Sequence, residues 1–256
     1  MLLQTHSLTI GYRNYIVQKN LNLSAQAGGL IGLMGTNGSG KSTLLRTLGG
    51  LQKPLKGNIA IQGQNLSKLS HYQRSLLFAF VLTDAIDHNT MTVFDLVSLG
   101  RFPYTNWAGA LSTKDREIIN TSIEQVNLVD KRDAYLNEIS DGERQRAIIA
   151  KALTQDTPLV LLDEPTAHLD LPNKVEIMLL LRKLSLNTHK TFILSTHELD
   201  LIMQTADTIW LIHANGIVVD TPKDLMQSGK LQEIFGSKFF YFDKQDKGFS
   251  VVVKQE

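Results

Sequence analysis

The chain has 256 residues, which is long enough for one large domain with a sizeable core, or for a core that carries a smaller subdomain. Lysine and arginine number 26 against 25 acidic residues, and the resulting formal charge of +1 does not favour a polyanionic partner such as nucleic acid. The absence of cysteine excludes disulfides, thiolate metal sites and a cysteine nucleophile.

The start of the chain and its apolar segments indicate where the protein works. The first residues, MLLQTHSL, have no basic region before an apolar run, unlike a secretory signal. The longest purely apolar run, residues 76–82, is far shorter than the ~20 residues of a membrane span. We therefore expect a cytosolic protein, which can still dock on a membrane protein.

The first part of the chain alternates apolar and polar residues in the manner of half-buried strands, at residues 8–12, 21–25 and 57–64. Glycine and asparagine close these short strands, so we predict an antiparallel layer near the N-terminus. Within this part, another apolar strand leads into a glycine-rich loop and then a helix, which Gly49 or Gly50 is placed to end.

Two later segments, residues 159–163 and 191–196, are predicted to be buried strands, and residues 173–184 between them have helical periodicity. Buried strands separated by helices predict a parallel sheet that is covered on both faces. Asn215 and Gly216 lie between two apolar runs, which predicts a hairpin. The last stretch, FFYFDKQDKGFSVVV, is typical of a terminal hairpin, to which we assign no function.

The middle region, roughly residues 84–156, has no clear strand. It offers helix starts at Thr92, Ser112 and Ser140, each followed three positions later by an acidic residue, as in a capping box. We predict a helical subdomain inserted between two strands of the core.

A phosphate-binding loop is predicted at residues 35–42, GTNGSGKS, which fit G-x-x-x-x-G-K-[ST] between a strand and a helix. Glycines let backbone N–H groups close around phosphates, and the helix N-terminus adds its positive end. Lys41 is expected to reach the β- and γ-phosphates, and Ser42 to bind Mg²⁺. The plainer alternative is a glycine-rich turn with an incidental lysine. The predicted nucleotide-binding residues are Gly35, Thr36, Asn37, Gly38, Ser39, Gly40, Lys41, Ser42 and Thr43.

Two acidic residues and a histidine follow the later strands. Asp163 is placed to hold Mg²⁺ at the carboxyl edge of a parallel sheet, and Glu164 to orient or deprotonate an attacking water. His197 follows the next strand and is expected to contact the γ-phosphate. The alternatives are an ordinary acidic turn and a surface or capping histidine.

Residues 139–146, ISDGERQR, open a helix in a way that suits an anion. In the plainer interpretation, Ser140 and Glu143 form a capping box that is worth about 1 kcal/mol to the helix. A cap alone does not explain Gly142, because glycine inside a helix costs about 1 kcal/mol relative to alanine. Close approach of a phosphate to bare backbone would explain it.

Together these segments resemble the nucleotide-binding subunit of ABC (ATP-binding cassette) transporters over about residues 3–229. Residues 139–146 are similar to the family's signature motif, L-S-G-G-Q, and we call them the signature segment. PTAHLD, residues 165–170, resembles the family's D-loop, and STH matches its switch histidine at His197. In the signature segment Ser140, Gly142, Arg144, Gln145 and Arg146 agree, whereas Ile139, Asp141 and Glu143 differ.

The resemblance implies a fold and a domain organisation. The fold class is α/β, a P-loop NTPase (RecA-like) core with a parallel sheet, an N-terminal antiparallel β layer and an inserted helical subdomain. The core with its β layer would comprise residues 1–83 and 157–225, the helical subdomain residues 84–156, and a C-terminal extension residues 226–256.

The resemblance also implies a shared ATP site. Two copies of the chain would dimerise on binding ATP and Mg²⁺, with the signature segment of one copy facing the γ-phosphate held by the other. Tyr12 would stack on the adenine, with Tyr15 as the alternative. The signature residues implied to act across the dimer are Ser140, Asp141, Gly142 and Glu143, and Asp170 is the D-loop acid.

One position departs from the family pattern. A glutamine that reaches the metal and the attacking water usually ends the strand before the helical subdomain, whereas Thr83 stands there in this chain. The threonine side chain is shorter by two heavy atoms. Either the backbone comes closer, a neighbour such as Asp84 substitutes, or coupling through this loop is altered.

Within the family, MTVFDLVSLGRFPYTNW at residues 91–107 and the AHLD form of the D-loop are similar to ATPases of importers for iron-siderophores, haem and cobalamin. The implied partners are integral membrane permease subunits and, indirectly, a substrate-binding protein, with no nucleic acid. The chain would then lie peripherally on the cytoplasmic face of the inner (plasma) membrane.

Two other classes of protein stay open as alternatives. The first is a soluble ABC-type ATPase acting on ribosomes or DNA, which the single phosphate loop, the lack of sustained heptads and the near-neutral charge disfavour. The second is a P-loop kinase, which would share the phosphate loop and the Mg²⁺ acid but not the signature segment. We expect an ATPase that hydrolyses ATP to drive transport.

Overall fold

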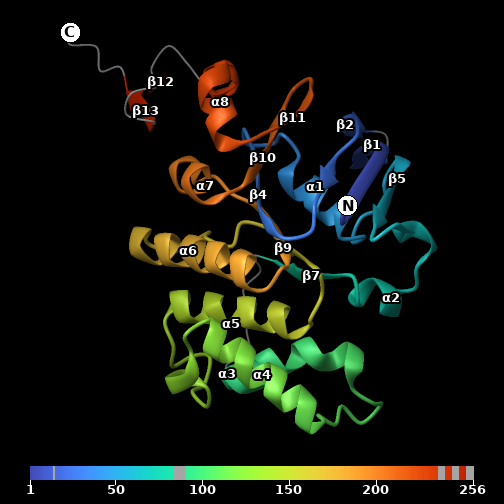
Figure 1. The fold of residues 1–256 in the computed structure, drawn as a ribbon, viewed down its shortest axis with the longest axis vertical. Helices are drawn as coiled ribbons and strands as arrows, with labels where there is room; N and C mark the ends of the chain where they lie inside the picture. The colour runs from blue at the N-terminus through green and yellow to red at the C-terminus, as the bar shows by residue number, and fades with distance from the viewer. Residues whose placement is uncertain (14, 83–89, 236–239, 244–247, 252–256) are drawn as a thin grey trace.

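A computed structural model (Figure 1) describes the whole chain except residues 14, 83–89, 236–239, 244–247 and 252–256. Strands and helices alternate through most of it, and the elements run in chain order as follows: β1 Leu3–Tyr12, β2 Tyr15–Leu21, β3 Ser24–Ala25, β4 Gly29–Gly35, α1 Lys41–Leu48, β5 Lys56–Ile61, β6 Gln64–Asn65, η1 Leu66–Lys68, α2 His71–Ser75, β7 Phe78–Val81, α3 Val93–Ser98, η2 Leu99–Tyr104, α4 Thr113–Gln125, η3 Val129–Lys131, α5 Asp141–Thr154, β8 Leu159–Leu162, α6 Leu171–Asn187, β9 Thr191–Ser195, α7 Leu199–Thr205, β10 Thr208–His213, β11 Gly216–Asp220, α8 Pro222–Ser228, α9 Lys230–Phe235, β12 Phe240–Asp243 and β13 Gly248–Val251.

A mostly parallel sheet forms the centre of the molecule. Its strand order is β11-β10-β4-β9-β8-β7, and every neighbouring pair is parallel except β10 with β11. Because the carboxyl ends of parallel strands meet at one edge, the segments after β4, β8 and β9 converge there. These are the segments that carry the predicted site residues.

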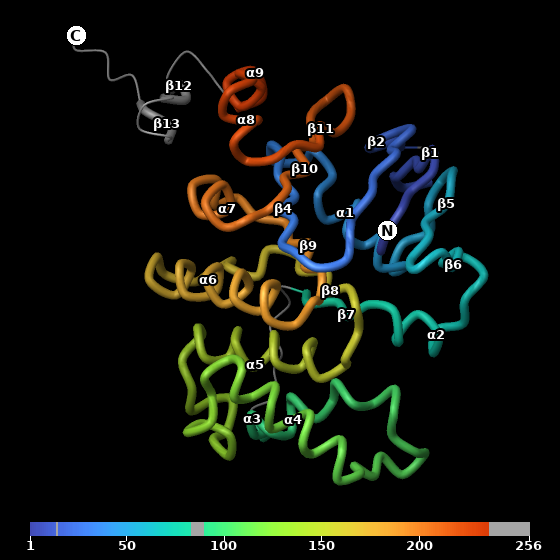
Figure 2. The backbone as a smooth tube through the Cα atoms, viewed as in Figure 1, coloured from blue at the N-terminus to red at the C-terminus, as the bar shows by residue number. Residues whose placement is uncertain are grey.

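Both faces of this sheet are buried, which explains why its strands are continuously apolar. In β4, Leu30 and Met34 point into one core cluster, whereas Ile31 and Leu33 point into the other. The first cluster adds α3, α4, α5 and α6, and the second adds α1 and the antiparallel strands β1 and β5. Figure 2 shows the antiparallel sheet at the upper right and the α3–α5 layer at the bottom, with strands of the parallel sheet in the middle. The predicted parallel sheet, covered on both faces, is confirmed.

The N-terminal antiparallel layer is also confirmed, since β1 pairs antiparallel with β2, β3 and β5. The strand expected at residues 21–25 is wrong in its bounds: β2 ends at Leu21, and only Ser24 and Ala25 pair further, as β3. Strand β2 was missed because its buried residues do not alternate. Its register with β1 shifts twice, as happens at β-bulges.

The helix starts of the middle region are confirmed. Thr92, Ser112 and Ser140 each form a capping box with the acidic residue three positions later. In the described part of this region, residues 90–156, the only β pairing is an isolated bridge between Thr92 and Tyr135. The sequence pattern of Ser or Thr followed by Asp or Glu therefore placed all three helices correctly.

Both predicted hairpins are present. Strands β10 and β11 pair antiparallel, although the turn is Ala214-Asn215 and Gly216 already begins β11. Strands β12 and β13 pair antiparallel near the C-terminus. No helix among the described residues combines the length and the apolar character needed to cross a membrane.

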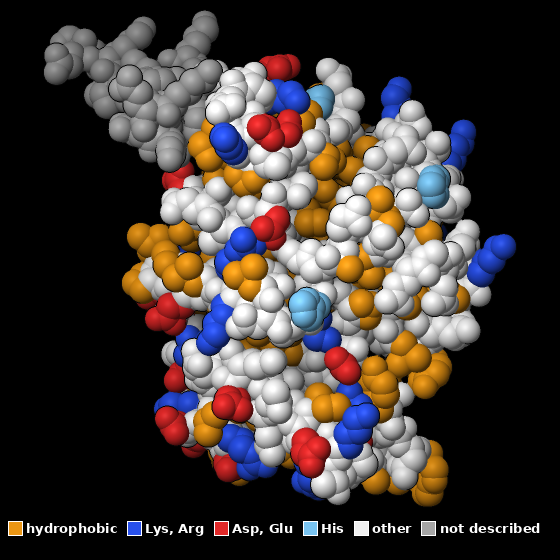
Figure 3. Space-filling view, in the orientation of Figure 1, with side chains coloured by type: hydrophobic (Ala, Val, Ile, Leu, Met, Phe, Trp, Pro, Cys, Tyr) orange, Lys and Arg blue, Asp and Glu red, His pale blue; other side chains and the backbone are white. Residues whose placement is uncertain are grey.

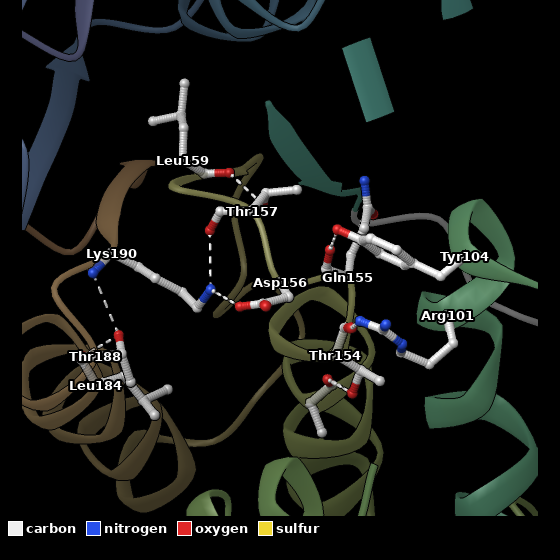
Figure 4. Close-up of polar contacts among 11 residues, drawn as sticks. Arg101, Tyr104, Thr154, Gln155, Asp156, Thr157, Leu159, Leu184, Thr188 and Lys190 are labelled. Atoms are coloured by element: carbon white, nitrogen blue, oxygen red, sulfur yellow. Dashed lines mark hydrogen bonds and ion pairs between the residues drawn. The ribbon is translucent and has the colours of Figure 1, made fainter. Parts of the chain in front are cut away.

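Polar contacts fix the C-terminal end of α5 to its surroundings (Figure 4). The buried guanidinium of Arg101 lies 2.7 Å from Asp115 Oδ1 and donates to Thr154 O at 3.0 Å. Just beyond the helix, Lys190 Nζ lies 2.9 Å from Asp156 Oδ1. Hydrogen bonds from Ser112, with help from Arg101, lower the pKa of Asp115, so this carboxylate stays charged. The contacts of Arg101 and Lys190 therefore hold the C-terminal end of α5, and they lie far from its N-terminal end.

Candidate functional site

The phosphate loop lies where the sequence predicts, between the end of β4 at Gly35 and the start of α1 at Lys41. Gly40 caps α1 with a left-handed backbone, φ 106°, and a β-carbon there would overlap the side chain of Val17. A larger residue at position 40 is thus excluded by conformation and by space. The backbone N–H groups at the start of α1 are therefore left free of side-chain caps, as an anion site requires.

Lys41 is buried beside this loop, with 6 % of its surface exposed. Its Nζ donates to the carbonyl oxygens of Gly35 at 3.0 Å and Thr36 at 3.3 Å. Burial lowers the pKa of Lys41, and the nearby carboxylates of Glu164 and Asp163 act in the opposite direction. A buried ammonium that donates to two carbonyl oxygens is well placed to exchange them for phosphate oxygens.

Asp163 follows β8 and lies across from the loop. Its Oδ1 accepts from Ser42 Oγ at 3.0 Å and from Ser195 Oγ at 2.7 Å. Ser195, the last residue of β9, is fully buried, and its hydroxyl also accepts from the backbone N–H of Glu164 at 2.9 Å. One serine therefore fixes both consecutive acidic residues.

Glu164 and His197 face each other at the opening of the site. His197 Nε2 lies 2.9 Å from Glu164 Oε1, and both side chains are partly exposed. Glu164 has a left-handed backbone, φ 48°, which an L-residue adopts only where surrounding contacts hold it. Glu164 lines the cavity, and its backbone N–H is held by Ser195 Oγ.

A cavity of about 410 Å³ joins these groups. Its volume falls in the range of small-ligand sites. Tyr12 lies on its wall with the hydroxyl 3.1 Å from Thr43 Oγ1, and Tyr15 lines the same cavity, so the structure leaves both tyrosines available to a base. The lining residues are Tyr12, Tyr15, Val17, Asn37, Gly38, Gly40, Lys41, Ser42, Thr43, Glu164 and His197.

A second cavity, of about 320 Å³, lies on the other side of Ser42 and is lined by Asp163, Glu164, Arg46 and His168, among others. A hydroxyl and a carboxylate beside a phosphate loop form a donor set that suits Mg²⁺, which is usually bound by one or two carboxylates plus phosphate oxygens and water. Among the described residues, no group of three or more His, Cys, Asp or Glu could hold a metal by itself. Ser42 and Asp163 therefore fit Mg²⁺ only together with a bound phosphate.

The signature segment forms the first turn of α5 and does not line either of these cavities. Ser140 Oγ accepts from the backbone N–H of Glu143 and lies 3.0 Å from Glu143 Oε2. The hydrogen bond from the Ser140 backbone lowers the pKa of Glu143. The Glu143 carboxylate therefore stays charged at neutral pH, and the capping box with Ser140 stays formed. Ser140 and Asp141 are exposed, whereas Gly142 is buried. Within one chain, the segment and the phosphate loop are separate sites.

A contact within the same chain explains why position 142 is a glycine. A β-carbon at this position would overlap the carboxamide of Asn173, a residue in the first turn of α6. Asn173 in turn donates to Asp170 Oδ1 through its backbone N–H at 3.1 Å and its Nδ2 at 2.6 Å. The sequence interpretation overlooked this contact, so a phosphate is not needed to explain the glycine. Close approach of a partner's phosphate stays a prediction.

Two residues that support the site were missed by sequence reasoning. Ser195 was noted only as part of a strand, although a polar residue directly after the apolar run Phe192–Leu194 was the available signal. Gln18 is buried and donates to His213 O at 2.9 Å and to Ser39 O at 3.4 Å in the phosphate loop, but it lies on the unpredicted strand β2. The predicted Thr83, with its substitute Asp84, lies outside the described residues.

Ser195→Ala is expected to lower ATP turnover on the order of tenfold while the fold is kept. The change leaves Asp163 and the Glu164 backbone without one hydrogen bond each, and such a bond is worth about 1 kcal/mol. Ser185→Ala is the matched control, because Ser185 is also buried but its hydroxyl donates only to the Arg182 carbonyl oxygen. Steady-state phosphate release with both purified variants makes the measurement. If the Ser195→Ala and Ser185→Ala variants hydrolyse ATP at the same rate, Ser195 does not support the site.

Comparisons with known proteins agree with this geometry. The family described as ABC transporter matches residues 18–167. The achromobactin transport ATP-binding protein CbrD of Dickeya dadantii is 35 % identical over 234 residues, 90 % of this chain and 86 % of that protein. The iron(3+)-hydroxamate import ATP-binding protein FhuC of Bacillus subtilis is 35 % identical over 198 residues, 77 % of this chain and 74 % of that protein. A dimeric ATP-binding cassette bound to ADP and Pi superimposes with a TM-score of 0.73 at 27 % identity, covering 86 % of this chain and 99 % of that one.

Proposed function

The chain belongs to the ABC transporter family and hydrolyses ATP, and from this we propose that it energises the import of a metal chelate through a membrane permease. The observation that carries the proposal is the convergence of Lys41, Ser42 and Glu164 on one cavity at the carboxyl edge of the sheet, with Asp163 hydrogen-bonded to Ser42 at 3.0 Å. The relatives named for achromobactin and iron(3+)-hydroxamate support a ferric siderophore as cargo, with haem and cobalamin as the other chelates of this type.

Each residue of the cavity has a proposed task. The phosphate loop and Lys41 bind the β- and γ-phosphates, and Tyr12 stacks on the adenine. Ser42 and Asp163 would hold Mg²⁺, which would neutralise the negative charge of the phosphates. Glu164 accepts a proton from the attacking water, and His197, 2.9 Å from Glu164, contacts the γ-phosphate.

The signature segment is proposed to complete the site of a second copy. Ser140 is exposed and can reach a partner, but its hydroxyl lies within hydrogen-bond distance of Glu143. Donation to the partner's γ-phosphate therefore requires the hydroxyl to rotate away from Glu143. The related cassette bound to ADP and Pi is dimeric, which supports the pairing of two copies. In the proposed dimer, Asp170 and the signature segment, residues 139–146, face the other subunit.

The proposed location is the cytoplasmic face of the inner membrane, where the chain would be held by permease subunits and served indirectly by a substrate-binding protein. ATPases that act on nucleic acid are disfavoured, because the formal charge is only +1 and charges of both signs are interspersed over the face seen in Figure 3. A P-loop kinase is disfavoured by the family itself.

Uptake into proteoliposomes tests the proposal. The chain is co-reconstituted with the permease and binding protein encoded beside it, ATP is enclosed, and ferric hydroxamate, haemin and cyanocobalamin are offered in turn as labelled cargo. We expect ATP-dependent accumulation of at least one of the three, lost with Glu164→Gln and kept with the exposed control Glu117→Gln. No accumulation of any chelate, together with ATP-dependent recovery of ribosomes from lysate, would contradict the transport function.

A further inference from the structure

The first two turns of α6 touch three segments that the proposed function uses. Asp170 of the D-loop caps the helix by accepting from the backbone N–H of Asn173. Lys174 Nζ lies 2.6 Å from Glu198 Oε1, directly after His197. Glu176 Oε2 lies 2.9 Å from Arg146 Nη1 in the signature segment. The start of α6 is thus in contact with the D-loop, the switch histidine loop and the signature segment.

Asn173 packs against the signature segment at Gly142. Its carboxamide occupies the space that a side chain at position 142 would fill: a β-carbon on Gly142 would lie 2.7 Å from Asn173 Cγ and closer still to Oδ1. The carboxamide cannot easily turn away, because its Nδ2 donates to Asp170 Oδ1 at 2.6 Å. Asp170, Asn173 and Gly142 therefore form one continuous line of contact.

The other end of α5 is held independently, by the contacts of Arg101 to Thr154 and of Lys190 to Asp156 shown in Figure 4. A helix fixed at its C-terminal end can still tilt at its N-terminal end. The contact with Asn173, together with the Arg146–Glu176 ion pair, limits that tilt. Of the two contacts, the one with Asn173 lies at Gly142 itself.

We infer that Asn173 is a positioning residue for the signature segment: clamped by Asp170, its carboxamide sets where the backbone at Gly142 stands when the segment meets the partner's ATP. This inference rests on the proposed function, because the position of the segment matters only if two copies close on ATP. It assigns Asp170 a second task within its own chain, which is to hold Asn173. It also makes the glycine at position 142 a requirement of packing within one subunit.

A double substitution separates this packing requirement from a direct requirement of the nucleotide. Gly142→Ala places a methyl group against the Asn173 carboxamide, whereas Asn173→Ala removes the carboxamide and leaves only its Cβ, 3.4 Å from the new methyl. The pair of changes therefore restores an ordinary contact. If glycine were needed for a phosphate instead, Asn173→Ala would not compensate.

The experiment uses the full chain carrying Glu164→Gln, in which ATP is held without turnover. The ATP concentration for half-maximal dimer, read by light scattering, should rise at least tenfold with Gly142→Ala and about threefold with Asn173→Ala. In the double variant it should return to within about twofold of Asn173→Ala alone. Asn187→Ala, an exposed asparagine at the end of the same helix, is the control and should change nothing.

Two further measurements separate the possible outcomes: the binding of ATP to the monomer and the midpoint of thermal unfolding. Binding of a fluorescent ATP analogue to the monomer should stay within about twofold in every variant, because the phosphate loop of the same chain is untouched. A double variant as impaired as Gly142→Ala, or a Gly142→Ala variant that dimerises normally, would overturn the inference.

If the parent chain fails to dimerise at all, the proposed function fails instead. The inference is then judged by the midpoint of thermal unfolding, which Gly142→Ala should lower and Asn173→Ala should restore.

Discussion

Glu164→Gln should lower ATP turnover by at least about a hundredfold while ATP binding is kept. A general base contributes on the order of 10²- to 10⁴-fold, and glutamine keeps the size of the side chain but cannot accept the proton. The carboxylate is the group in the cavity best placed for this task, because the backbone of Glu164 is held by Ser195 and its Oε1 lies 2.9 Å from His197. Phosphate release and equilibrium binding of ATP, measured on the same preparation, give the two quantities.

The control for this prediction is Glu117→Gln, the same chemical change at an exposed position of α4. Its turnover should match that of the unaltered chain. Wild-type turnover in Glu164→Gln would defeat the assignment of the general base. Loss of ATP binding in the same variant would point to a structural role for the carboxylate instead.

Lys41→Ala should weaken ATP binding by at least about a hundredfold and abolish turnover with it. The ammonium is buried and, among the described residues, donates to the carbonyl oxygens of Gly35 and Thr36 alone, so phosphate oxygens are stronger partners for it. Charged hydrogen bonds of this kind contribute about 1.5–3 kcal/mol each, and two of them account for the expected loss. Isothermal titration with ATP and Mg²⁺ measures the affinity.

A structural role must be separated from this loss, because Lys41 also ties the two ends of the loop together. Lys41→Met keeps the length of the side chain without its charge and should be as defective in binding as Lys41→Ala. Lys183→Ala, at an exposed position of α6, should bind as the unaltered chain does. A Lys41→Met variant that binds ATP normally would show that the charge is not what holds the phosphates.

The sequence was sufficient for much of the fold because the decisive signals are local. Apolar runs predicted β4, β8 and β9, and three capping boxes predicted α3, α4 and α5. Strand β2 escaped because a bulged edge strand loses the period of two that marks a strand. The turn between β10 and β11 lies one residue earlier than predicted, because turn chemistry alone does not fix the position of a turn to a single residue.

The candidate site divides in the same way. The phosphate loop and the acids after β8 could be predicted because their residue types and spacing are fixed by phosphate chemistry. Gln18 and Asn173 could not, because each acts through a partner more than 20 residues away in the sequence. Ser195 was missed although its place at the end of a buried strand was an available signal. Gly142 shows the risk in reading a single residue: its cost within a helix was noticed, but the neighbour that requires it lies in another helix. The roles of the phosphate loop, the two acids, His197, Tyr12, Asp170 and the signature segment all remain predictions.

The claim that two copies share their ATP sites is tested most directly by the mass of the Glu164→Gln chain in solution. Light scattering should give 28.6 kDa without nucleotide and twice that value with ATP and Mg²⁺. Adding Ser140→Ala should keep the mass at that of one chain, although ATP still binds. A Glu164→Gln chain that stays at 28.6 kDa with saturating ATP, or a Ser140→Ala chain that doubles at the same ATP concentration, would contradict the shared site.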